Sequence, residues 1–176
     1  MITLNDAKKI ITAAENKVVE IGQPMNIAVV DSGGNLVAHE RMDGAWIGSI
    51  DISVKKAFTS RAFDISTKDL ATQCQPGGQF YGIHVSNNGK VMIFAGGIPL
   101  KRNYQVVGAI GVSGGSGEQD QSVAEAGTTA FWRLLELILQ ITNMFLLRIF
   151  DSLLKLKVDM FIDFKMYNSL ETTYKL

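Results

Sequence analysis

The first part of the chain has the hydrophobic spacing of an amphipathic helix. Apolar residues recur at intervals of three and four positions from Leu4 to Ile21, and Gly22 follows as a stop signal. Thr3 and Asp6 have the spacing of a capping box, in which each side chain bonds the backbone N–H of the other. The pattern predicts a helix that buries one face.

Five later segments have the composition of β-strands. Each is dominated by apolar and β-branched residues and is bounded by turn-forming residues. The expected strands are Asn26 to Asp31, Leu36 to Met42, Phe80 to Val85, Val91 to Ala95 and Tyr104 to Val112. Asn87-Asn88-Gly89 predicts a hairpin, and the stretch from Gly96 to Leu100 predicts a chain reversal that Pro99 stiffens at its exit.

Helical spacing returns in three further segments. It runs from Gly48 to Phe63, continues in a short helix that Ser66 and Asp69 would cap, and resumes at Glu118. The fold class expected is therefore α+β, with a five-stranded antiparallel sheet flanked by helices.

Composition and charge narrow the classes of function. A chain of 176 residues can bury a core without disulfides, and its formal net charge of zero argues against a nucleic-acid partner. The single cysteine, Cys74, cannot form an intramolecular disulfide, and no His or Cys cluster has metal-site spacing. No uninterrupted apolar leader is visible, so a cytoplasmic location is expected.

The glycine-rich junction before the last helix is the strongest candidate for a ligand site. Ser113 to Gly117 leads directly into Glu118, Gln119 and Asp120, and backbone N–H groups at such a helix start can hold an anion. Neither the dinucleotide pattern GxGxxG nor the phosphate-loop pattern GxxxxGK[ST] is present. The alternative is that these glycines only permit tight backbone packing and a turn.

Several motifs together identify a family. GGIPLK at 96–101, GAIGVSG at 108–114, EQD at 118–120, VVDSGGNLVAHERMDGA at 29–45 and KKAFTSRAF at 55–63 occur in order. Over about Leu4 to Ala130, the chain resembles the GlcG/HbpS-like family. The resemblance implies a profilin-like α+β domain that assembles into a homo-oligomer, a dimer or higher. It also implies relatives that bind or degrade haem, one that is fused to a cobalamin adenosyltransferase, and others linked to glycolate or diol metabolism.

The resemblance and the glycine turns together suggest the ligand-binding residues. A carboxylate or phosphate would lie among backbone N–H groups, with one cation nearby. Of the adjacent Lys55 and Lys56, only one can face a cleft, and the family match favours Lys56. The candidate residues are Asp43, Lys56, Gly96, Gly97, Pro99, Gly111, Ser113 and Gly114. Asp43 could instead cap a turn, and Lys56 could be a solvated lysine.

Candidate catalytic groups are scarce. His39 and His84 are the two histidines, both in expected strands, and either could be a surface or core residue rather than a haem ligand. Several members of the family carry histidine where this chain has Asn35, which is a poor haem ligand. No serine triad, metal site or carboxylate pair is identifiable, and the catalytic residues stay unknown.

Two functions remain open. One is a non-catalytic binder of haem, a corrinoid or a small anionic metabolite, with an accessory role in glycolate, diol or glycerol metabolism. The other is an enzyme of small-molecule metabolism or haem degradation. The scarcity of catalytic groups favours the binder.

The composition changes abruptly at Phe131. Residues 131–176 contain no glycine, alanine or proline, whereas residues 1–130 form the expected domain. Leu134 to Phe150 is apolar except for a few residues including Glu136 and Arg148, which makes it a poor membrane span. The tail could be an oligomerisation helix, a membrane-surface helix, or sequence foreign to the family from a shifted frame or read-through. The last is favoured, because relatives usually end near Ala130.

Overall fold

The computed structural model describes the backbone of residues 1–173 and the side chains of residues 1–132, 140–142 and 144–157. By its internal contacts the chain divides into two units, Met1–Arg133 and Leu134–Leu176. The sheet and all cavities described below belong to the first unit. Among the described residues, no helix combines the length and hydrophobicity required to cross a membrane.

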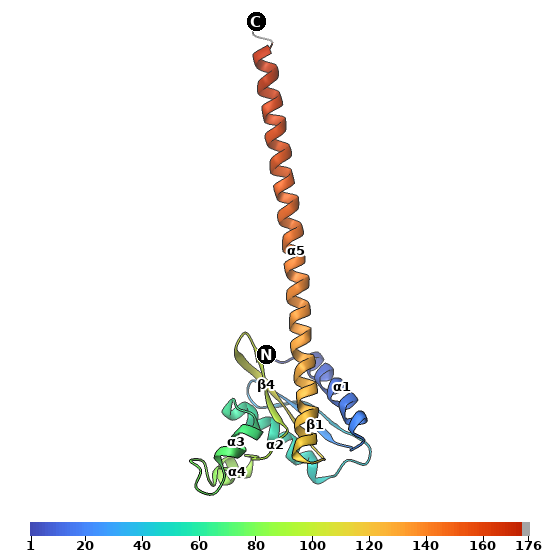
Figure 1. Cartoon of the computed structure of the whole chain (residues 1–176), viewed down its shortest axis with the longest axis vertical. Helices are drawn as coiled ribbons and strands as arrows, with labels where there is room; N and C mark the ends of the chain where they lie inside the picture. The colour runs from blue at the N-terminus through green and yellow to red at the C-terminus, as the bar shows by residue number, and fades with distance from the viewer. Residues whose placement is uncertain (174–176) are drawn as a thin grey trace. The chain divides into compact units, whose positions relative to one another are not determined.

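The first unit contains a four-stranded antiparallel sheet, shown in Figure 1. The strand order is β2-β1-β4-β3, so the long strand β4 is central and β3 lies at an edge. The strands are β1 (Asn26–Asp31), β2 (Leu36–Arg41), β3 (Gly97–Arg102) and β4 (Gln105–Ser113). The helical segments are α1 (Leu4–Ile21), α2 (Gly48–Phe63), α3 (Thr67–Gln73), η1 (Ile83–Val85), α4 (Ser86–Gly89) and α5 (Gly117–Thr173).

Helices cover both faces of the sheet. On one face, Ala57 of α2 packs in a cluster with Ala28, Val30 and Ala109. On the other face, α1 lies beside the start of α5 (Figure 1), where a Cβ atom on Gly127 would lie 3.1 Å from Ile10 of α1 and 2.7 Å from Ile110 of β4. The core therefore lies in two layers, one above and one below β1 and β4.

The predicted helix starts are confirmed. Thr3 Oγ1 accepts a hydrogen bond from the amide nitrogen of Asp6 at 3.1 Å, and Asp6 Oδ2 accepts one from the amide nitrogen of Thr3 at 3.0 Å. At α3, Ser66 Oγ accepts a hydrogen bond from the amide nitrogen of Asp69 at 3.0 Å. Each bond satisfies a backbone N–H that the helix itself leaves free.

The predicted number of five strands is wrong, because residues 80–85 and 91–95 form no strand. Val91 is 1% exposed and packs with Leu70 and Cys74, so side-chain burial rather than strand pairing fixes this segment. Asn87 and Asn88 do adopt positive φ angles of 52° and 56°, but the segments flanking them do not pair. Residues that favour a tight turn produce a hairpin only when the segments on either side of them pair as strands.

The stretch expected to reverse the chain is instead β3. Pro99 lies opposite Ala109 of β4, and no strand of the described residues pairs with the other side of β3. An edge position tolerates proline, because no second strand needs its missing N–H. The reversal occurs one strand later, at Asn103 and Tyr104, which have φ angles of 52° and 64°.

Candidate functional site

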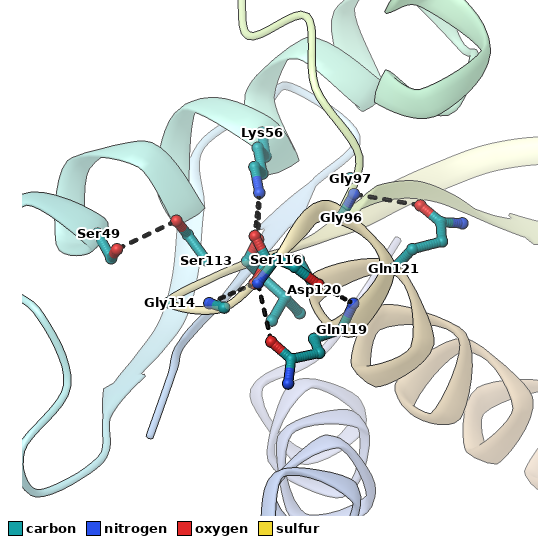
Figure 2. Close-up of polar contacts among 12 residues, drawn as sticks. Ser49, Lys56, Gly96, Gly97, Ser113, Gly114, Ser116, Gln119, Asp120 and Gln121 are labelled. Carbon is teal, nitrogen blue, oxygen red and sulfur yellow. Dashed lines mark hydrogen bonds and ion pairs between the residues drawn. The ribbon is translucent and has the colours of Figure 1, made fainter. Parts of the chain in front are cut away.

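Four segments meet at the glycine-rich junction: α2, the Gly96-Gly97 entry into β3, the end of β4 and the start of α5. Figure 2 shows Lys56 reaching from α2 toward Asp120 in the first turns of α5. The Lys56 ammonium nitrogen lies 2.6 Å from Asp120 Oδ2 and 2.8 Å from the carbonyl oxygen of Val112. Its side chain is fully buried, and that of Asp120 is 4% exposed.

Burial opposes charge on both members of this ion pair, whereas the neighbouring groups favour it. Burial lowers the pKa of Lys56, and the Asp120 carboxylate acts in the opposite direction. Burial likewise raises the pKa of Asp120, against the charge of Lys56 and a hydrogen bond from the amide of Gly115. The face of the Phe94 ring, whose centroid is 4.8 Å from the Lys56 nitrogen, further favours the ammonium form.

Side chains of the protein occupy the backbone donors that the sequence assigned to an anion. The amide of Gly97 donates to Thr67 Oγ1 at 2.8 Å, and that of Gly96 donates to Gln121 Oε1 at 3.1 Å. At the helix start, the amide of Gly115 donates to Asp120 Oδ1 at 3.0 Å. The anion at this helix N-terminus is thus a carboxylate of the chain itself.

The glycines at the junction allow close packing. A Cβ atom on Gly96, which has a φ angle of 114°, would lie 2.6 Å from the carbonyl oxygen of Val112. A Cβ on Gly111 would collide with the backbone of Ser53 and Ala57 in α2. The alternative interpretation of tight packing therefore accounts for these two positions.

The structure gathers most of the predicted site residues but separates others. Lys56, Gly96, Gly97, Gly111, Ser113 and Gly114 surround the junction, where Ser113 Oγ donates to Ser49 Oγ at 3.2 Å. Pro99 lies on the edge strand β3. Asp43 lines a different cavity of about 500 Å³. Binding of an external anion at the junction stays a prediction.

A cavity beside the junction has charged residues of both signs at its rim. A cavity of about 220 Å³ opens beside Ala95 and Gln121, and its charged residues are Lys68, Glu118 and Glu125. An external ligand entering there would meet two carboxylates and one lysine, and Lys56 does not line this cavity. Such a rim disfavours a dianion.

The cavity that contains Asp43 holds a pair of carboxyl groups that the sequence did not reveal. Glu15 of α1 and Glu40 of β2 both line it, together with Arg41. Burial and the neighbouring Glu40 raise the pKa of Glu15. The two glutamates are distant in sequence, so only the packing of α1 against β2 brings them together.

The two histidines differ in their surroundings. His39 lies in β2, as expected, and its Nε2 atom is buried without a hydrogen-bond partner among the described residues. Burial lowers the pKa of His39, and Glu40 acts in the opposite direction. His84 lies in η1 rather than in a strand, is exposed, and lines a largely apolar cavity of about 260 Å³ with Val91, Met92, Ile93 and Phe94.

The chain matches a known protein family within its first unit. A family model described as haem-degrading protein HbpS-like matches residues 2–129. An uncharacterized 15.0 kDa protein from the dhaT-dhaS intergenic region of Citrobacter freundii is 43% identical over 133 residues, which are 76% of this chain and 94% of that protein. The corrinoid adenosyltransferase PduO of Citrobacter freundii is 34% identical over 129 residues, 73% of this chain but 38% of that longer protein.

Solved structures with the same fold include a haem complex. A Klebsiella pneumoniae protein, ORFY, has a TM-score of 0.73 and 41% identity, with 74% of this chain and 90% of that chain covered. The haem complex of PduOC has a TM-score of 0.71 and 32% identity, with 73% of this chain and 94% of that chain covered. The similarity extends over the first unit.

Proposed function

Because the chain belongs to the family of HbpS-like proteins, we propose that it is a small-molecule-binding protein whose ligand is a metal tetrapyrrole, haem or a corrinoid. The observation that carries the proposal is the similarity to the haem complex of PduOC over 94% of that chain. The relation to a corrinoid adenosyltransferase supports the wider class of ligand.

The geometry of the glycine-rich junction favours this ligand class over a small free anion. Its buried lysine and its backbone donors already have partners in Asp120, Thr67 and Gln121. A small carboxylate or phosphate would have to replace those bonds in order to bind there, at a cost of about 1 to 3 kcal/mol for each group left unpaired. A tetrapyrrole can instead bind through apolar contact and one metal bond.

Titration of the full chain with haemin and with cobalamin tests the proposal. We expect a Soret band of haemin that shifts and saturates at one ligand per chain, because binding replaces water around the macrocycle and at the iron. A saturating change with cobalamin instead would identify a corrinoid as the ligand. If haemin gives the same linear titration with the protein as with buffer alone, and the cobalamin spectrum does not change, both ligands are ruled out.

The enzymatic alternative is haem degradation, which the description of the family model suggests. It is tested on the same haem complex by adding ascorbate as an electron donor in air and in nitrogen. Oxygen-dependent loss of the Soret band, faster than for free haemin, would indicate an enzyme. A stable band would indicate a binding protein.

A further inference from the structure

The most apolar of the cavities described above is formed by the segment that follows α3. Its volume is about 260 Å³, and it is lined by His84, Val91, Met92, Ile93 and Phe94. Two of its five lining residues, His84 and Met92, carry a potential metal donor atom. The Glu15 cavity is lined by one methionine, Met42, but by no histidine, and the cavity beside the glycine-rich junction is lined by neither.

The wall of this cavity is fixed to the core. Val91 is 1% exposed and packs against Leu70, and Ile93 packs against the same cluster. The amide of Met92 donates to Thr59 Oγ1 of α2 at 2.8 Å. The packing of Val91 and Ile93 and the hydrogen bond of Met92 therefore hold the backbone of this short stretch in place.

The donor set suits a metal that already has most of its ligands. The described residues contain no group of three or more His, Cys, Asp or Glu side chains that could hold a bare metal ion. A metal in a macrocycle has its equatorial positions filled and needs only axial ligands. The imidazole of His84, which is exposed, is a side chain that serves this purpose in haem proteins, whereas the half-buried Met92 belongs to the wall.

The surface around the cavity provides apolar contact for a flat ligand. The segment 80–94 exposes four large apolar side chains, namely Phe80 (41%), Tyr81 (66%), Val85 (74%) and Phe94 (45%). Since a cavity of about 260 Å³ cannot enclose a tetrapyrrole, part of the macrocycle would rest on this surface. Lys90, whose nitrogen lies 5.5 Å from the centre of the Phe58 ring, is the cation on the same segment for a propionate.

We propose that His84 is the axial ligand of a metal tetrapyrrole that binds over the cavity formed by His84, Met92 and Phe94. The inference rests on the proposed function and adds the binding site and the metal-ligating residue. Met92 contributes apolar contact within the wall, and Lys90 pairs with a propionate of the ligand.

The test is a haemin titration of the full chain, followed by absorption and electron paramagnetic resonance spectroscopy. His84→Ala should weaken haemin binding at least about tenfold and change the spin state of the iron, because an axial nitrogen is lost. Added imidazole should restore the wild-type spectrum. Met92→Leu should retain the spectrum, since leucine keeps the apolar wall. His39→Ala is the matched control, because it removes the other histidine and leaves the cavity intact.

The outcomes separate the site from the function. Haemin binding by the wild type, with the His84→Ala variant unchanged in affinity and spectrum, would overturn the site and leave the proposed function standing. The same holds if His39→Ala, rather than His84→Ala, changes the iron spectrum. No binding of any tetrapyrrole by the wild type would overturn both. His84 is exposed, and circular dichroism will check that the variant is folded.

Discussion

A buried lysine beside a buried aspartate is stabilising only as a pair. Lys56 and Asp120 have each lost their hydration, and each compensates the charge of the other at 2.6 Å. Removing one partner leaves the other buried and unpaired. We therefore expect the pair to favour one arrangement of the start of α5 on α2.

Replacing Lys56 with Met should lower the free energy of unfolding by about 3 to 5 kcal/mol, because Asp120 loses its counter-charge. The neighbouring Lys55 provides the control, since its ion pair with Asp51 lies near the surface at 2.8 Å. Lys55→Met should cost about 1 kcal/mol or less. Urea unfolding measures both, and equal costs would contradict a structural role for the buried pair.

The same variants test Lys56 as a ligand-binding residue. If the lysine binds a ligand carboxylate, as predicted from the sequence, Lys56→Met should weaken haemin binding by at least about tenfold. If its charge is used entirely by Asp120, the folded variant should bind haemin as tightly as the Lys55→Met protein. Calorimetry below the unfolding temperature distinguishes the two.

Glu15 should make stability depend on pH in an unusual direction for a carboxyl group. Its pKa in the folded state is raised above the ordinary value of 4.5, so the folded state binds the proton more tightly than the unfolded state. Its favourable contribution is complete below about pH 4.5 and is lost as the pH rises through the raised folded pKa. Glu15→Gln should therefore be more stable than the wild type at pH 7, and this advantage should vanish at pH 4.

Thermal unfolding at several pH values measures this difference. Glu20→Gln is the control on the same helix, because Glu20 makes an exposed ion pair with Lys17. It should show no gain at pH 7. A Glu15→Gln advantage that persists unchanged into acid would contradict the carboxyl pair as its source.

At the scale of the element, local signals identified helices better than strands. The capping pairs at Thr3 and Ser66 depend on neighbours within three residues, so the sequence contains all the information needed. Strand β3 depends on pairing with β4, and its Gly-Gly and Pro99 have the composition of a turn. The segment from Val91 is apolar because it packs on Leu70, which a strand pattern cannot distinguish from pairing.

The candidate site shows the same limit. The sequence indicated an anion at the start of α5, and a carboxylate is bound there, but it belongs to Asp120. The EQD motif was the available signal, because an aspartate in the first turn can cap its own helix. The cavity with His84 and Met92 could not be predicted, since both residues were assigned to a hairpin that does not form.

The β3–β4 turn offers a prediction at the element scale. Tyr104 has a φ angle of 64°, which lies in the left-handed region, and its side chain is fully exposed. Tyr104→Gly should stabilise the protein by about 0.5 to 1 kcal/mol, the relief of backbone strain less the extra flexibility of glycine. Tyr104→Ala keeps the strain and should give no gain. Urea unfolding of both variants checks this.

At the scale of the whole molecule, the boundary of the domain can be tested sharply. Phe131, one residue beyond the boundary expected from composition, is 2% exposed, and the Arg102 guanidinium carbon lies 5.4 Å from the centre of its ring. We predict that residues 1–133 fold cooperatively alone. A chain ending at Ala130 should be less stable by about 3 to 5 kcal/mol, because it lacks a buried aromatic side chain. Equal stability would show that Phe131 adds nothing to the core.

The second unit should promote association. Its described side chains expose many large apolar residues, including Phe145 (64%), Leu147 (64%) and Phe150 (64%). We expect the full chain to form larger assemblies than residues 1–133, because such a surface is buried by contact with other molecules. Light scattering compares the two chains. A dimer of residues 1–133 would support the oligomer implied by the family resemblance, and a monomer would argue against it.

The separation of Lys56 and Asp120 by 64 residues has a kinetic consequence. Their attraction can act only after the long loop between them has closed and water has left the site, so both conditions place the pair late in folding. Interactions absent from the transition state slow unfolding and leave the folding rate almost unchanged. The buried pair should therefore act as a latch on the finished fold, and Lys56→Met should accelerate the unfolding arm of a chevron plot while its refolding arm stays in place.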